Sequence, residues 1–592
     1  MRLLATYFRR FLKHRTRLVL GILSIPLAQS LDVATTILVG QALDRVRASS
    51  DVDWLTTTLL LLGGAALAHA FFRFWQRWLI VVVSRRFEVE LKQELFDHLA
   101  RLDFAFHDRS RSGDLVSRLT ADVEALRMFL GPGLMYTLGA VVIVPISLSW
   151  LMTLNLWLGL SIGLPMIAVG VIMKRLTPRL HRESTAVQES LADISHRAQE
   201  DFGGVRVVKG YHREGAQARR FDRASAKNRD NQVALGRARG LTHAAINGSF
   251  DLTFAVILTV GGLAAIDRTL PVGSLFQFID LTLKVFWPLI ALGWIAGMYP
   301  RAVASAERVD TLLATRSALG EREAGEAPEQ AVAGALELRG VGFTYPKGTK
   351  PALRGIDARV ESGGSLGVVG PTGCGKSTLL LLLGRQMDPQ EGAVLLDGRD
   401  LRELALPHAR GALGYVPQDA FLFSVPYADN IRFGADGDLS DEEVAELIEQ
   451  AAMTEEVARF PEGAQTLIGE RGVTLSGGQR QRTCIARALA RDPKVLVLDD
   501  CLSAVDTETE RQLLGTLREA GSGRTVVVAA HRLSTVASCD EILVLDDQGS
   551  IAQRGRHEDL LEAAGWYRDT WEQQQRREAS EREVAEPEGG HA

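Results

Sequence analysis

The sequence predicts two domains of different fold class in one chain: an α-helical membrane domain and an α/β domain of alternating strands and helices. Apolar residues gather in long runs before about residue 300 and thin out afterwards. A polar, acidic linker follows, and beyond it short apolar strands precede helices. We therefore place the transmembrane domain at 1–315, the linker at 316–334, the α/β domain at 335–572 and a polar tail, expected to be disordered, at 573–592.

Composition excludes some classes of protein. A chain of 592 residues is too long for one ordinary core. Its net charge of −5 gives no basic field, so nucleic acid is not expected as a partner. The four cysteines lack metal-ligand spacing and are interpreted as structural or incidental thiols: Cys374, Cys484, Cys501 and Cys539.

Six stretches are long enough to cross a hydrocarbon core, which takes about 20 residues of helix. They lie near 18–42, 54–83, 129–153, 156–176, 243–266 and 273–298. The basic N-terminus followed by an apolar stretch superficially resembles a signal peptide. Because that stretch continues past Asp32 without a cleavage pattern, a retained first transmembrane helix is favoured.

The connections between the spans set the orientation. Lys and Arg are dense before the first span, between the second and third, and between the fourth and fifth. The positive-inside rule therefore predicts a protein of the cytoplasmic (inner) membrane with both termini and the α/β domain in the cytoplasm. The two long basic connections are predicted to be helices extending below the membrane rather than loose loops, with turns near 106–119 and 202–211 that reach toward the α/β domain.

Charged residues within the spans are costly and usually face the protein interior or a cavity. The clearest cases are Asp32, Asp251, Asp280 and Lys284. Asp280 and Lys284 are four residues apart on one helix face, so they can neutralise each other. A structural ion pair is favoured over substrate contact.

A glycine-rich loop opens a helix in the α/β half. The strand at 365–369 leads into Gly-Pro-Thr-Gly-Cys-Gly-Lys-Ser at 370–377. Glycines leave backbone N–H groups free to wrap phosphate oxygens, while Lys376 reaches the β- and γ-phosphates and Ser377 ligates Mg²⁺. The motif therefore predicts ATP and Mg²⁺ as ligands. The predicted nucleotide contacts are Gly370, Thr372, Gly373, Cys374, Gly375, Lys376, Ser377 and Thr378.

Two later strands end at polar residues. The strand at 495–498 precedes Asp499 and Asp500, and the strand at 525–530 precedes His531. An acid at such a strand end holds Mg²⁺ in phosphate-loop enzymes, which fits Asp499. Asp500 is placed to orient the attacking water, and His531 to sense the γ-phosphate. A lone exposed histidine is more often incidental, but its place after a second buried strand favours function.

Leu475-Ser476-Gly477-Gly478-Gln479 resembles the signature of ABC transporter ATPases, and six spans before one such domain resemble the exporter-type half-transporter of that family. The resemblance implies a P-loop ATPase fold with an ABC helical subdomain. It assigns Tyr345 to adenine stacking, Gln418 to Mg²⁺ ligation and catalysis, and Asp506 to the D-loop at 503–506. Residues 469–472 resemble an exporter-specific loop that contacts the partner subunit.

The resemblance also implies partners. Two ATPase domains sandwich two ATP molecules, each bound by the phosphate loop of one subunit and the signature of the other. The signature residues are Ser476, Gly477, Gly478 and Gln479. A second half-transporter subunit, membrane lipid and a small hydrophobic or amphipathic substrate are the expected partners.

One position departs from the family pattern. Asp500 stands where the family normally has Glu, so this chain's own site is expected to hold ATP and hydrolyse it slowly. The intact signature favours a heterodimer with one degenerate site over a slow homodimeric exporter or flippase. Six fused spans exclude a soluble ATPase, and an ATP-gated channel or membrane regulator is a second alternative. The predicted mechanism is alternating access driven by closure of the ATPase domains.

Overall fold

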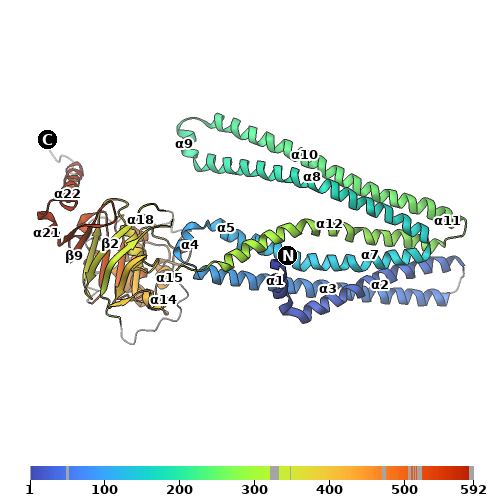
Figure 1. Cartoon of the computed structure of the whole chain (residues 1–592), viewed down its shortest axis with the longest axis horizontal. Helices are drawn as coiled ribbons and strands as arrows, with labels where there is room; N and C mark the ends of the chain where they lie inside the picture. The colour runs from blue at the N-terminus through green and yellow to red at the C-terminus, as the bar shows by residue number, and fades with distance from the viewer. Residues whose placement is uncertain are drawn as a thin grey trace. The chain divides into compact units, whose positions relative to one another are not determined.

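The computed structural model describes residues 2–48, 52–319, 332–346, 348–469, 475–503, 509–510, 512–513, 515 and 523–585. The chain divides into two compact units. The first, the helical unit, comprises Met1–Ala100 and Ser112–Thr315, and the second, the sheet unit, comprises Arg101–Arg111 and Arg316–Ala592. The sheet unit carries two β-sheets (Figure 1).

Long helices make up the helical unit. Short π-helical and 3₁₀ segments interrupt them. In chain order the elements are α1 (Arg2–Phe11), η1 (Leu12–His14), α2 (Arg15–Ala48), α3 (Val52–Arg101), α5 (Ser112–Ser117), η2 (Arg118–Asp122), α6 (Val123–Met128), η3 (Phe129–Gly133), α7 (Leu134–Leu154), α8 (Leu156–Gly203), α9 (Val205–Gly210), α10 (Glu214–Val256), η4 (Ile257–Gly261), α11 (Gly262–Ile266) and α12 (Val272–Ala314).

All six predicted spans lie in helices, namely α2, α3, η3 with α7, α8, α10 with η4 and α11, and α12. Among the described residues, five helical stretches are long and apolar enough to cross a membrane. The remaining span, 156–176, lies in α8, where several side chains fall outside the described part of the chain. The predicted helical membrane domain is thus confirmed.

The predicted extensions below the membrane are also helical. α8 and α10 pack side by side, and α9 joins them at the far end, within the predicted turn at 202–211 (Figure 1). The short turn between α7 and α8 forms at Asn155, whose extended backbone ends one helix. The Asn155 side chain accepts a hydrogen bond from the backbone N–H of Leu158 at 3.0 Å and so caps the next helix.

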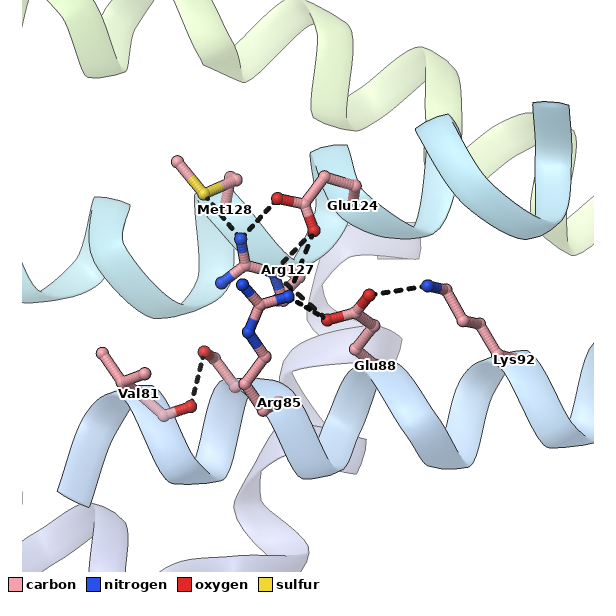
Figure 2. Close-up of polar contacts among 8 residues, drawn as sticks. Val81, Arg85, Glu88, Lys92, Glu124, Arg127 and Met128 are labelled. Carbon is pink, nitrogen blue, oxygen red and sulfur yellow. Dashed lines mark hydrogen bonds and ion pairs between the residues drawn. The ribbon is translucent and has the colours of Figure 1, made fainter. Parts of the chain in front are cut away.

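A buried charge network ties α3 to α6. Figure 2 shows the Arg127 guanidinium directed at Glu124 and Glu88. Arg127 Nε lies 2.7 Å from Glu124 Oε2 and 3.4 Å from Glu88 Oε2, and the Arg127 side chain is only 6% exposed. Arg85 and Lys92, on the same helix as Glu88, donate to that carboxylate at 2.8 and 2.7 Å. These contacts hold α6 against α3.

A second network ties the same segment to α12. Asp122, at the end of the π-helical turn η2, accepts a hydrogen bond from Ser305 Oγ at 2.9 Å and from Arg308 Nε at 2.8 Å. The Asp122 side chain is buried. The segment from η2 to η3 is therefore fixed on two sides, between two π-helical turns of a kind that often marks functional positions.

Inside the predicted spans, Lys284 pairs with both nearby acids. Its Nζ lies 2.9 Å from Asp32 Oδ1 on α2 and 3.2 Å from Asp280 Oδ2 on its own helix, α12. Thr36 joins them, accepting from Lys284 at 2.7 Å and donating to Asp280. The pair predicted between Asp280 and Lys284 is present, and the contact with Asp32 turns it into a tie between two helices.

Two sheets build the sheet unit. The smaller, antiparallel sheet has the order β2-β1-β4-β5, and the larger has the order β10-β9-β3-β8-β7-β6, parallel except for the edge strand β10. The strands are β1 (Leu336–Phe343), β2 (Leu353–Val360), β3 (Ser365–Val369), β4 (Glu391–Leu396), β5 (Arg399–Asp400), β6 (Leu413–Val416), β7 (Val495–Asp499), β8 (Thr525–Ala529), β9 (Glu541–Leu545) and β10 (Ile551–Gly555).

The larger sheet is covered on both faces, as its nearly all-apolar strands require. Along β7, Val497 enters one hydrophobic core while Leu496 and Leu498 enter the other. The helices of this unit are α4 (Phe104–Arg109), α13 (Lys376–Leu383), α14 (Leu406–Gly411), α15 (Tyr427–Arg432), α16 (Asp441–Gln450), α17 (Thr454–Ala458), η5 (Gly463–Gln465), α18 (Gly477–Leu489), α20 (Leu533–Val536), α21 (His557–Glu562) and α22 (Trp566–Ala585).

The C-terminal helix α22 extends into the predicted polar tail. The helix α22 continues through the first part of the segment at 573–592, up to Ala585, where disorder was expected from composition. Trp566 and Trp571 pack against the core of the sheet unit, and Glu572 pairs with Arg568 and Arg576 at i, i+4 spacing. An anchored base and charge pairs along the helix give a physical reason for this helix.

Candidate nucleotide-binding site

The glycine-rich loop joins β3 to α13. Gly370, Gly373 and Gly375 have φ angles of 150°, 84° and 102°, a region that favours glycine. A Cβ atom at Gly375 would lie 2.4 Å from the carbonyl oxygen of Ala352. The loop therefore needs glycine at this position to deliver the N-terminus of α13, where free N–H groups favour an anion.

Lys376 lies over this loop. Its ammonium donates hydrogen bonds to the carbonyl oxygens of Gly370 at 3.0 Å and Pro371 at 3.2 Å, and the residue is only 7% exposed. Both of these partners are neutral carbonyls, so the ammonium can exchange them for phosphate oxygens. The predicted role at the β- and γ-phosphates fits this position.

Two of the three predicted Mg²⁺ ligands, Ser377 and Asp499, meet although they are far apart in sequence. Ser377 Oγ donates to Asp499 Oδ1 at 3.0 Å. They meet because β3 and β7 are parallel strands separated only by β8, so their carboxyl ends share one edge of the sheet. A hydroxyl and a carboxylate on one side suit Mg²⁺, which usually completes its shell with water and substrate phosphate.

Burial controls the electrostatics of Asp499. Desolvation raises the pKa of its carboxyl, and the charge of the neighbouring Asp500 acts in the same direction. The hydrogen bond from Ser377 and the charges of Lys376 and His531 oppose that rise. A divalent cation placed here would replace the missing hydration of the carboxylate.

Asp500 and His531 also come together. The backbone N–H of His531 donates to Asp500 Oδ1 at 3.3 Å, and the backbone N–H of Asp500 donates to the carbonyl oxygen of Ala529 at 2.9 Å. Asp500 has φ of 43°, an uncommon left-handed conformation for a residue other than glycine. This strained position at the end of β7 is typical of functional sites.

The predicted adenine platform borders the same helix. Tyr345 is 40% exposed, and its hydroxyl lies 3.2 Å from Thr378 Oγ1 in the first turn of α13. Its ring packs edge-on against Phe343 with centroids 5.1 Å apart. The Tyr345 ring is thus held by a neighbouring ring while the residue remains partly exposed.

The third predicted Mg²⁺ ligand, Gln418, lies just after the strand that pairs with β7. It follows β6, and its side chain is exposed. In the described part of the chain it forms no hydrogen bond with Ser377 or Asp499. Its predicted role at Mg²⁺ stays a prediction. Asp506 and residues 470–472 lie outside the described residues.

The signature segment forms the start of α18. Ser476 is the N-cap residue, and its Oγ accepts the N–H of Gln479 at 3.2 Å while Gln479 Oε1 accepts the N–H of Ser476 at 3.0 Å. This reciprocal capping box fixes the entry to the helix. Gly477 and Gly478 fill the first turn, where the absence of side chains leaves the backbone accessible.

Sequence reasoning missed two residues near the site. Tyr415 of β6 lies beside Asp499, and burial, together with that carboxylate, raises the pKa of its hydroxyl. Gln574 of α22 hydrogen-bonds to the backbone at His531 and Leu533. Tyr415 was foreseeable as a strand neighbour of Asp499, whereas no motif marks Gln574.

Known proteins share this architecture. Residues 18–289 match the family described as the ABC transporter transmembrane region, and residues 353–503 match the family described as ABC transporter. The multidrug resistance-like ATP-binding protein MdlA of Escherichia coli is 34% identical over 537 residues, covering 88% of this chain and 87% of the relative. An ATP-dependent lipid A-core flippase of Vibrio cholerae is 30% identical over 566 residues, covering 95% of both.

A solved structure agrees in fold. A bacterial Atm1-family ABC exporter with ATP bound matches with a TM-score of 0.77 and 28% identity over 95% of this chain and 98% of that one. The chain belongs to the ABC transporter family. It is an exporter-type half-transporter, a membrane domain fused to one ATPase domain that couples ATP hydrolysis to transport.

Proposed function

We propose that the chain exports a hydrophobic or amphipathic substrate from the cytoplasmic side of the inner membrane, and that its own ATP site hydrolyses slowly. The observation that carries the second part is Asp500, the residue that directly follows the predicted Mg²⁺ ligand Asp499. Asp is one methylene shorter than the Glu expected there, which withdraws the carboxylate by roughly 1.5 Å.

The position of Asp500 supports this proposal. Its Oδ1 accepts the backbone N–H of His531, so the short carboxylate lies against the residue that follows β8. Misplacement of a catalytic group by about 1 Å can lower a positioned reaction about 100-fold. ATP held at this site would therefore act mainly as a clamp between two subunits.

The remaining residues would hold ATP, its cation and its γ-phosphate in place. Mg²⁺, when bound, neutralises phosphate charge, and Ser377 and Asp499 would hold it. Lys376 would exchange its two carbonyl partners for phosphate oxygens, and Tyr345 would support the adenine. His531 would contact the γ-phosphate from the end of β8.

A heterodimer follows from the contrast between two features of the chain. Asp500 weakens its own site, whereas the capped start of α18 preserves the signature that a partner's ATP requires. The partner would then carry the faster site. A slow homodimer is the second candidate, favoured by the retained His531.

The proposed substrate class and the proposed orientation in the membrane are supported by the relatives and by the charge of the connections between spans. The relatives named above include a multidrug resistance-like protein and a lipid A-core flippase, names that fit amphipathic cargo. The basic connections between spans support a cytoplasmic ATPase domain. Closure of two ATPase domains on ATP would turn the cavity outward, and hydrolysis in the partner's site would reset it.

Affinity purification of the tagged chain from its native membrane tests the assembly. We expect a second half-transporter with Glu at the position equivalent to Asp500, together with an amphipathic ligand. Recovery of the tagged chain with copies of itself alone would contradict the heterodimer. In vesicles carrying the purified complex, ATP-dependent accumulation of that ligand against a gradient would separate a pump from a channel.

A further inference from the structure

The C-terminal helix reaches the γ-phosphate end of the predicted ATP site through one side chain. Gln574 Nε2 donates to the carbonyl oxygen of His531 at 2.9 Å, and Gln574 Oε1 accepts the backbone N–H of Leu533 at 2.9 Å. The backbone fixes this amide orientation, since the carbonyl can only accept and the N–H can only donate. One amide thus bridges both sides of the turn that carries His531.

Gln574 projects from an anchored part of α22. Tyr567 is fully buried, and its hydroxyl lies 2.7 Å from His557 Nδ1. Trp571 packs on the same imidazole with centroids 4.6 Å apart. Trp571 and Gln574 are three residues apart and therefore share a helix face. The aromatic anchor directs Gln574 at the turn.

The turn that carries His531 is short. It links β8 to α20, whose first backbone N–H, that of Leu533, has no partner within the helix. On its other side, Thr535 and Arg532 contact the buried carboxylate of Glu510. The backbone N–H of His531 contacts Asp500. The carbonyl oxygen of His531 accepts a hydrogen bond from Gln574.

We propose that Gln574 is a positioning residue for ATP hydrolysis, which fixes the backbone of His531 and thereby the direction of its imidazole toward the γ-phosphate. This inference rests on the proposed role of His531. Loss of the bridge leaves the nucleotide-binding loop intact because Gln574 contacts neither Lys376 nor Ser377. The defect therefore appears in the chemical step rather than in ATP affinity.

Single-turnover hydrolysis by the full-length chain in lipid nanodiscs tests the proposal, since this measurement detects slow sites. Gln574→Met keeps the length of the side chain and removes both hydrogen bonds. We expect the rate to fall about tenfold, with the apparent ATP affinity within about twofold and the melting temperature unchanged. Gln575→Ala, at the exposed neighbouring position, is the matched control and should leave all three unchanged.

A double-mutant cycle separates positioning from a purely structural effect. Adding Gln574→Met to His531→Ala should lower the rate no further, because the bridge acts through His531. Equal losses in both backgrounds would overturn the inference. A rate lowered by His531→Ala and untouched by Gln574→Met would overturn the inference alone. A rate unaffected by His531→Ala would overturn the proposed role of His531 as well.

Discussion

Charged side chains in the networks of the helical unit and at the predicted ATP site of the sheet unit serve different purposes. In the helical unit they meet each other: Lys284 lies between Asp32 and Asp280, and Arg127 lies between Glu88 and Glu124. The charges are neutralised within the protein, and the contacts join different helices. These networks hold helices in place and leave little unpaired charge for a ligand.

At the predicted ATP site of the sheet unit, charged groups gather without neutralising one another. Asp499 and Asp500 are adjacent acids at the end of β7, and Lys376 rests on neutral carbonyls instead of a carboxylate. The raised pKa of Asp499 reflects its burial beside a like charge. Such a cluster is completed by a ligand, here a nucleotide with its cation. The contrast separates structural charges from binding charges.

The largest effect is expected where a binding charge is removed. Lys376→Ala should lower ATP turnover about 100-fold or more, because Lys376 is the predicted partner of the β- and γ-phosphates. The folded state should tolerate the change, since the hydrogen bonds of the Lys376 ammonium go to two neutral carbonyls.

Binding of a fluorescent ATP analogue and ATP hydrolysis by the full chain provide the measurement. Lys350→Ala, at an exposed lysine in the same unit, is the matched control. Equal activity of the two variants would contradict the assignment of Lys376.

A smaller effect, on stability rather than turnover, is expected where a structural charge is removed. Arg127→Met leaves the carboxylates of Glu88 and Glu124 without their shared partner (Figure 2). Breaking a buried pair in this way costs about 3 kcal/mol of unfolding free energy. Nucleotide affinity should stay unchanged.

The exposed pair Arg10–Glu94 is the comparison for that variant. Arg10→Met should cost less than about 1 kcal/mol, because solvent screens the pair. Thermal unfolding in detergent measures both, and equal shifts for the two variants would show that burial of Arg127 contributes nothing.

The smallest effect concerns pH and the aromatic anchor of α22. Burial lowers the pKa of His557 below its ordinary value of 6.5. The unfolded chain therefore binds more protons than the folded one just below that value. The contribution of His557 to the free energy of unfolding is therefore full above about pH 6.5, and it is lost as the pH falls through the lowered pKa of His557.

Melting temperatures between pH 5 and 8 test this sign. His557→Gln should flatten the acid side of the profile relative to the parent chain. His408→Gln, at an exposed histidine, should leave the acid side of the profile unchanged. A parent profile that rises as pH falls would contradict the assignment.

The sequence predicted the spans and the phosphate loop because both depend on local patterns. A run of about 20 apolar residues indicates a membrane-spanning helix. The phosphate loop is recognised from its own glycines together with the strand before it and the helix after it. Ser377 and Asp499 lie within hydrogen-bond distance because the parallel strands that precede them end at the same edge of the sheet.

Contacts between distant segments were harder to predict. The partner of Lys284 was predicted within its own helix, yet Asp32, 252 positions away in sequence, lies closer. The composition of the tail segment likewise does not show that Trp571 packs on the core of the sheet unit or that Gln574 bridges a turn. Both depend on tertiary packing, which one sequence does not display.

The central claim is that Asp500 makes this chain's own site slow. The direct measurement is steady-state ATP hydrolysis by the chain purified alone, compared with Asp500→Glu and Asp500→Asn at matched ATP affinity. We expect slow ATP turnover in the parent chain and a turnover up to about 100-fold faster in Asp500→Glu. Brisk turnover in the parent chain that Asp500→Asn abolishes would contradict the claim.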